Sequence, residues 1–76
     1  MGIQVKLYGP LEKYGDRGEV HFAEIKPGWT IEQLLDCLRI PRPAIGFITV
    51  NGCKALLTYR LQENDVIKVF PHVSGG

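Results

Sequence analysis

The last two residues of the chain, Gly75 and Gly76, are the ones whose types suggest a specific chemistry. They have no side chains, so a partner can close around their backbone, which can also take conformations closed to other residues. We expect the carboxylate of Gly76 to be the most accessible reactive group of the chain. A free carboxylate is a poor electrophile and becomes reactive when an ATP-using partner converts it to an acyl-adenylate. Two glycines alone are a weak signal, because chain ends are usually frayed.

Other reactive residues form no recognisable catalytic set. No nucleophile has a base beside it in the sequence, and the two histidines, His21 and His72, are too far apart to predict a metal site. We interpret His21 as a solvent-facing strand residue. Cys37 and Cys53 are spaced too widely for a CxxC redox pair, and we expect both to be reduced and partly buried. The sequence therefore predicts no metal site and no bound cofactor.

Size and composition exclude several classes of protein. A chain of 76 residues has room for one domain. Its net charge of +1, with both signs mixed along the chain, argues against a nucleic-acid binder that works by neutralising phosphates. No apolar run approaches the roughly 20 residues of a membrane span, and the first residues lack the apolar block of a signal peptide. We expect a cytoplasmic protein with no membrane partner.

Hydrophobic periodicity predicts the elements around these residues. Apolar and polar residues alternate in strand-like runs, and Asn51-Gly52 is a strong two-residue hairpin turn. The expected strands cover residues 3–8, 19–25, 45–50, 53–55 and 66–70, with an early end or a bulge at 23–24 in the second. Residues 11–18 carry two glycines and four charges, which indicates a solvated loop that can include one helical turn around Leu11 to Tyr14.

One helix is predicted, beginning after Thr30. Thr30 and Gln33 have the spacing of a capping box, and prolines end the helix no later than Ile40. Its apolar stripe follows helical spacing. Strands with one helix packed on a mixed sheet make an α+β domain, and we expect its core to contain Ile3, Val5, Leu7, Phe22, Ile31, Leu34, Leu35, Leu38, Ile48, Val50, Ile67 and Val69.

Strand alternation places two aromatic residues, Phe47 and Phe70, on the sheet face away from the helix, near Tyr8. If that face is open, the aromatic side chains form an apolar patch of the kind that marks a partner surface. The alternative is that a loop covers them. Several basic residues either rim this surface or are simply solvated: Arg39, Arg42, Lys54, Arg60 and Lys68.

The whole chain resembles the ThiS/MoaD-type sulfur carriers of the ubiquitin-like β-grasp superfamily. The most specific part is the end of the chain, residues 66–76, which is similar to the family's last strand, its Phe-Pro pair and its Val-x-Gly-Gly finish. Val50-Asn51-Gly52 matches the family's hairpin, and Lys26-Pro27-Gly28-Trp29-Thr30-Ile31 resembles the segment that leads into its helix. His72 departs from the pattern, because molybdopterin-synthase small subunits often have a second proline there. The Phe-Pro pair nevertheless favours the MoaD side.

The resemblance implies a ubiquitin-like β-grasp fold: a mixed sheet of four to five strands with one helix across one face. It divides the chain into a domain at 1–71 and a flexible tail at 72–76. It also implies a carrier and not an enzyme. An E1-like adenylating enzyme would bind the domain, receive Val73, Ser74 and Gly75 in its channel, and use ATP to activate Gly76. We expect the adenylating enzyme or the acceptor enzyme to bind Phe47, Phe70 and Pro71.

Sulfur transfer to the adenylate would leave a thiocarboxylate modification at Gly76. A sulfur-acceptor enzyme, such as the large subunit of molybdopterin synthase, would then use it to make molybdopterin. Three alternatives stay open: sulfur transfer to the thiazole of thiamin, sulfur transfer to a tRNA base, and a ubiquitin-like modifier that forms isopeptide bonds. The sequence does not choose among these acceptors, nor does it give the sulfur donor or the oligomeric state.

Overall fold

The central element of the structure is β5 (Val66–Pro71), which lies between β1 (Ile3–Leu7) and β3 (Ile45–Val50). The structure is a computed structural model, and it describes residues 2–72. Beyond β1 lies β2 (Glu19–Phe22), and beyond β3 lies β4 (Cys53–Ala55), which gives the order β2-β1-β5-β3-β4. β1 and β5 run parallel, and the other neighbours are antiparallel. The predicted mixed sheet is confirmed.

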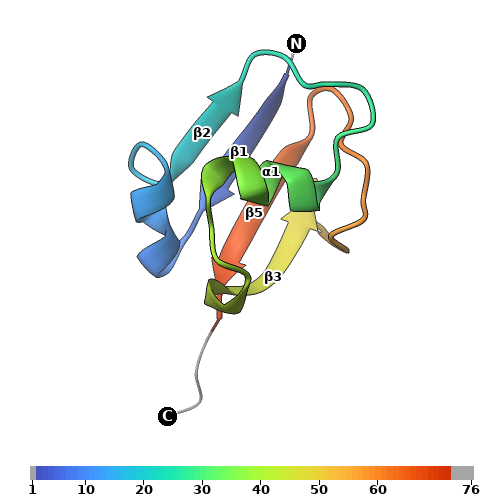
Figure 1. Cartoon of the computed structure of the whole chain (residues 1–76). Coiled ribbons are helices and arrows are strands. Elements are labelled where there is room, and N and C mark those ends of the chain that lie inside the picture. Colours follow the sequence, from blue (N-terminus) through green and yellow to red (C-terminus); the bar gives the residue numbers. More distant parts are fainter. Residues whose placement is uncertain (1, 73–76) are drawn as a thin grey trace.

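The helix α1 (Ile31–Leu38) crosses one face of this sheet (Figure 1). It begins at Thr30 because the predicted capping box is formed: the Gln33 amide donates to Thr30 Oγ1 at 3.3 Å, and the Thr30 amide donates to Gln33 Oε1 at 2.9 Å. It ends where Arg39 takes a left-handed conformation, with φ of 61°. The predicted α+β class is therefore confirmed.

Two short 3₁₀ helices lie at the end of the sheet where β1 and β5 finish. The first, η1 (Gly9–Tyr14), follows β1, and the second, η2 (Arg42–Ala44), leads into β3 (Figure 1). The helical turn expected within residues 11–14 is present as part of η1, but the prediction that this segment is solvated is wrong at Leu11, which η1 buries almost completely. Leu11 was not recognised as a core residue because the residues that follow it are mostly charged.

The core between α1 and the sheet contains most of the predicted residues. Phe22 and Leu38 are exceptions, because they are only half-buried at its margin. Leu11, Ile40 and Leu61 are buried and were not predicted. Each of these three lies outside the α-helix and the strands, where neither the helical nor the strand period could indicate its side.

The turns agree with the sequence in most places. Asn51 and Gly52 both have positive φ, 52° and 87°, as the hairpin requires. β2 ends at Phe22, the early end that the break in alternation indicated. The expectation that Cys37 and Cys53 are partly buried is wrong, since both are exposed; both are free thiols.

Within residues 2–72, no helix has the length and apolar character needed to cross a membrane.

Candidate functional site

The end of β5 is held by backbone contacts with the segment that leads into β3. The His72 amide donates to the Ala44 carbonyl at 2.9 Å. A Cβ added at Gly46 would lie 2.6 Å from the Pro71 carbonyl oxygen, so the two backbones approach more closely than a side chain permits. The chain therefore leaves the sheet at a defined point.

A second glycine contacts the same proline. Gly9, at the start of η1, has φ of +58°, and a Cβ there would lie 3.1 Å from Pro71 Cγ. The pairing of β3 with β5 is also irregular between Ile45 and Phe47, which is where Gly46 meets β5. We call Gly9, Gly46 and the Ala44–His72 hydrogen bond the tail clamp. It fixes Pro71, one of the predicted partner-binding residues, in a half-buried position.

The three aromatic side chains named from the sequence form one stack on the sheet face opposite α1. The Phe70 ring lies 4.8 Å from Tyr8 at an interplanar angle of 3°, and 4.5 Å from Phe47 at 14°. Phe47 is 43% exposed, and the other two are half-buried. We call these residues the aromatic stack. The predicted open aromatic face is thus confirmed, and its role in partner binding stays a prediction.

Lysines lie beside the aromatic stack on the same face. Lys6 and Lys68 are direct neighbours on the parallel strands β1 and β5. Lys54 on β4 pairs with Thr49, which in turn pairs with Lys68, and the Lys54 Nζ lies 5.7 Å from the centroid of the Phe47 ring. Lys6 is also paired with Glu19 on β2, which offsets part of its charge, so Lys54 and Lys68 are the lysines of this face that favour a partner with negative charge.

The sequence identified only part of this basic group. Lys54 and Lys68 were among the expected rim residues, but Lys6 was missed because its proximity to Lys68 depends on the pairing of two strands far apart in the chain. Arg42, another of the expected rim residues, is engaged in salt bridges with α1. Its guanidinium lies 2.9 Å from Asp36 Oδ1 and 3.7 Å from Glu32 Oε2 on α1.

The predicted tail residues Val73, Ser74, Gly75 and Gly76 lie outside the described residues. The division into a domain at 1–71 and a tail at 72–76 likewise stays a prediction. The residues of the tail clamp had not been predicted as functional. The sequence places Gly46 directly before Phe47 in the predicted strand, and a glycine inside a strand can indicate a close backbone approach. That the approach is to Pro71 depends on the register of β3 and β5.

The opposite end of β5 is organised around the buried carboxylate of Asp65. Its Oδ1 accepts from Asn51 Nδ2 at 2.9 Å, and its Oδ2 accepts from the Tyr59 hydroxyl at 3.0 Å and the Gln62 amide at 2.9 Å. Burial raises the pKa of Tyr59, and the hydrogen bond and charge of Asp65 raise it further. We call this cluster the Asp65 network.

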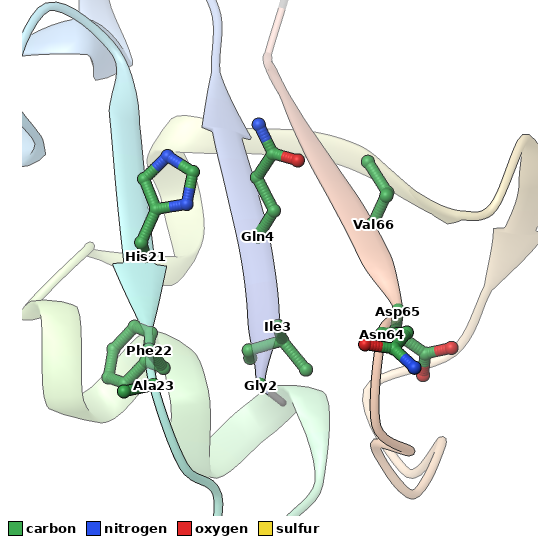
Figure 2. A pocket seen from close by; sticks show the side chains of 9 residues that line it. All are labelled: Gly2, Ile3, Gln4, His21, Phe22, Ala23, Asn64, Asp65 and Val66. Atoms are coloured by element: carbon green, nitrogen blue, oxygen red, sulfur yellow. The ribbon is translucent and has the colours of Figure 1, made fainter.

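A shallow hollow lies beside the Asp65 network. Figure 2 shows His21, Gln4 and Val66 next to one another on β2, β1 and β5, with Asp65 and Asn64 at the start of β5. The Asp65 oxygens are already engaged by neighbours within the chain. In the part of the chain that the structure describes, no group of three or more His, Cys, Asp or Glu residues could hold a metal ion. The candidate site is therefore the other end of β5, with the tail clamp and the aromatic stack.

Comparisons with known proteins concern the whole chain. A family model described as Mut7-C ubiquitin matches residues 1–75. The crystal structure of small archaeal modifier protein 1 from Haloferax volcanii has a TM-score of 0.77 at 21% identity, covering 95% of this chain and 98% of that chain. No curated protein matches the chain in sequence.

Two further solved structures are similar. A putative molybdopterin converting factor, subunit 1, from Pyrococcus furiosus has a TM-score of 0.76 at 21% identity, covering 96% of this chain and 99% of that one. Urm1 from Trypanosoma brucei has a TM-score of 0.74 at 19% identity, covering 99% and 95%. Likeness at these identities concerns the fold, and it confirms the ubiquitin-like β-grasp fold expected from the sequence.

Proposed function

We propose that this chain, which belongs to the Mut7-C ubiquitin family, is a sulfur carrier whose Gly76 carboxylate is activated by an E1-like adenylating enzyme. The observation that carries the proposal is the tail clamp beside an open aromatic stack. The aromatic stack offers a docking surface, and the tail clamp fixes the position of the residues that precede the predicted tail. In this proposal the chain is a carrier, and the partner enzymes carry out the chemistry.

The activation step follows from the reactivity of a carboxylate. A Gly76 carboxylate oxygen attacks the α-phosphorus of ATP on the partner enzyme, pyrophosphate leaves, and a mixed anhydride with AMP forms. Hydrosulfide, delivered by a sulfur donor, then attacks the acyl carbon. A C–S bond forms, the C–O bond to AMP breaks, and the proton of the hydrosulfide passes to water. The product is a thiocarboxylate, whose sulfur is nucleophilic at neutral pH.

Two features of this chain would serve that reaction. Gly75 and Gly76 have no side chains to obstruct a narrow active-site channel. The aromatic stack offers exposed apolar area for docking, with Phe47 as its most exposed member. In this proposal Phe47, Phe70 and Pro71 bind the adenylating enzyme or the acceptor enzyme, and Gly76 carries the sulfur.

As acceptor we propose a precursor of molybdopterin, on the large subunit of a molybdopterin-synthase-type enzyme. The Phe70-Pro71 pair supports this choice, as does the similar fold of the putative molybdopterin converting factor subunit. The main alternative is a protein modifier, in which a lysine amine displaces AMP from the same adenylate and an isopeptide bond forms. The similar fold of a protein named a small archaeal modifier supports that alternative. Thiazole and tRNA acceptors remain further alternatives for the same carrier chemistry.

Intact-mass spectrometry tests the proposal. The protein is first isolated from its own cells to establish that the mature chain ends at Gly76. It is then incubated with the adenylating enzyme, ATP and sulfide. We expect a mass increase equal to one sulfur replacing one oxygen, localised to the C-terminal peptide. A chain that lacks Gly76 is the control and should stay unmodified at equal stability.

Three results would oppose the proposal. A mature chain that continues past Gly76 would remove the reactive carboxylate. An unmodified wild-type chain, or equal sulfur incorporation by the chain without Gly76, would also contradict the carrier function. If a lysine-containing protein is added and a branched isopeptide forms in place of the thiocarboxylate, the modifier alternative is correct.

A further inference from the structure

Part of one edge of β3 has no neighbouring strand within residues 2–72. β5 pairs with β3 from Ile45 to Val50, but β4 pairs only with its second half, from Ile48 to Val50. The first half, Ile45–Phe47, therefore has β5 on one side and no described strand on the other. An exposed strand edge of this kind is a template for an added strand.

The segment after β4 cannot fill this position because it is bonded elsewhere. The Leu57 carbonyl accepts from the Glu32 amide at 3.0 Å, and the Tyr59 carbonyl accepts from the Ile31 amide at 3.1 Å. These two bonds tie the segment to the first turn of α1. The edge of β3 is thus left open by the way the chain satisfies the helix terminus.

A groove with a volume of about 330 Å³ runs along this open edge. Its apolar lining includes Phe47, Leu56 and Leu57, which are the exposed large hydrophobic residues of the described chain, at 43%, 76% and 36% exposure. Arg42 and Lys54 also line the groove, and no acidic residue does. We call it the β3 groove.

The two cations differ in availability. Arg42 is engaged by Asp36 and Glu32, so much of its charge is offset. Lys54 lies over the Phe47 ring and has no salt bridge to a described residue. A carboxylate in the groove would therefore meet Lys54 as the main positive charge, beside apolar side chains.

We propose that the β3 groove binds an extended segment of a partner protein that alternates apolar and acidic side chains. The segment adds a strand to Ile45–Phe47 in line with β4, which is the β-augmentation mode of peptide recognition. Its apolar side chains contact Leu56 and Leu57, and its carboxylates pair with Lys54. The groove is distinct from the tail, so this inference goes beyond the carrier function and does not depend on it.

The experiment titrates the isotope-labelled full chain with a short N-acetylated peptide of alternating isoleucine and aspartate, followed by NMR. We expect saturable shifts centred on the amides of residues 45–47 and 54–57. A peptide with lysine in place of aspartate should bind about tenfold more weakly, because its charge is wrong for Lys54. A peptide N-methylated at its central residue should also lose binding, because it cannot complete the strand pairing.

A matched pair of variants locates the charge. Lys54→Glu should weaken binding about tenfold, whereas Lys26→Glu, the same change at an exposed lysine after β2 on the far edge of the sheet, should leave the affinity within about twofold. Leu56→Ser removes an apolar contact and should also weaken binding. Because Leu56 is 76% exposed, this substitution should leave the fold intact.

Several outcomes would overturn the proposal. Shifts centred on β2, or on Tyr8 and Phe70, would place the peptide elsewhere. Equal binding of the lysine peptide, or equal effects of Lys54→Glu and Lys26→Glu, would remove the charge complementarity. Self-association of the free chain through residues 45–47, measured by sedimentation, would make a second copy the occupant in place of a partner segment. A chain unable to form the thiocarboxylate but still able to bind the peptide would contradict only the carrier function.

Discussion

The two ends of β5 are held by different kinds of contact. At its start, the buried Asp65 carboxylate joins Asn51, Tyr59 and Gln62 through directional hydrogen bonds. At its finish, Pro71 is held by close backbone approach to Gly46 and Gly9, and stacked rings stand half-exposed beside it. The first end is a closed polar network, and the second depends on shape and leaves apolar surface outside.

The contacts at the start of β5 mainly stabilise the fold, whereas those at its finish also leave a surface open for a partner. A satisfied buried carboxylate fixes the strand register and is costly to disturb, and both oxygens of Asp65 already accept hydrogen bonds within the chain. A backbone contact through glycine holds a strand end in place without covering it, so the adjacent rings stay available to a partner. Substitutions at the Asp65 network should therefore change stability alone, whereas those at the tail clamp and the aromatic stack should also change the position of the strand end or the binding of a partner.

Asp65→Ala should have the largest effect, a loss of roughly 3 kcal/mol in the free energy of unfolding. It leaves the Tyr59 hydroxyl, the Asn51 amide group and the Gln62 amide without their acceptor. Urea denaturation measures this loss. Glu63→Ala, an exposed acid nearby, is the control and should change stability by less than about 0.5 kcal/mol. Equal losses for the two variants would show that the network does not secure this end of β5.

Gly46→Ala should cost about 1–3 kcal/mol, because its Cβ would lie 2.6 Å from the Pro71 carbonyl oxygen. It should also speed hydrogen exchange at the His72 amide by moving Pro71 away from Ala44. Gly28→Ala is the control, because Gly28 has no heavy atom within 4 Å of an added Cβ and incurs only the backbone strain of its φ of +83°. If the His72 amide exchanges at the same rate in both variants, Gly46 does not position the tail.

Phe70→Ser removes two ring stacks, each worth about 0.5–1.5 kcal/mol, and should leave the fold intact. Its main effect should be about tenfold weaker binding to the adenylating enzyme, measured by calorimetry. Phe22→Ser is the matched control: Phe22 packs at the margin of the core against Trp29, so the variant should lose stability and keep its affinity. A collapsed fold in Phe70→Ser would assign Phe70 to the core.

Tyr59→Phe should have the smallest effect, visible as a change in the pH dependence of stability. The pKa of Tyr59 is raised in the folded protein above 10.0, so its contribution to stability is fully present below that value and is lost as the pH rises through the folded pKa. The wild type should therefore be more stable than Tyr59→Phe at neutral pH, and the difference should shrink above pH 10.0. A constant difference in urea denaturation across this range would contradict the coupling to Asp65.

The sequence predicted what local spacing determines. Thr30 with Gln33, Asn51 with Gly52, and the alternation along β1 and β5 act within a few residues, and the structure has each of them as expected. The shared face of Phe47 and Phe70 could also be predicted from strand alternation, whereas the stacking of their rings depends on the register of β3 and β5.

Contacts between distant segments could not be predicted in the same way. The approach of Gly46 to Pro71 and the adjacency of Lys6 and Lys68 depend on strand order and register. Leu11 is buried by a 3₁₀ helix whose glycine and charged neighbours resemble those of a loop. The open edge of β3 results from the shortness of β4. Each of these features depends on contacts between segments that are far apart in the sequence, and the spacing of neighbouring residues does not indicate such contacts.

The parallel pairing of β1 with β5 also constrains how the protein can be made. The middle of the sheet joins Ile3–Leu7 to Val66–Pro71, so nearly the whole described chain must be synthesised before the sheet can close. Loops that span such a distance close slowly, and until then the β3–β4 hairpin lacks the strand against which it packs. On the ribosome, the fold should therefore appear late and all at once, only after Pro71 has emerged from the exit tunnel.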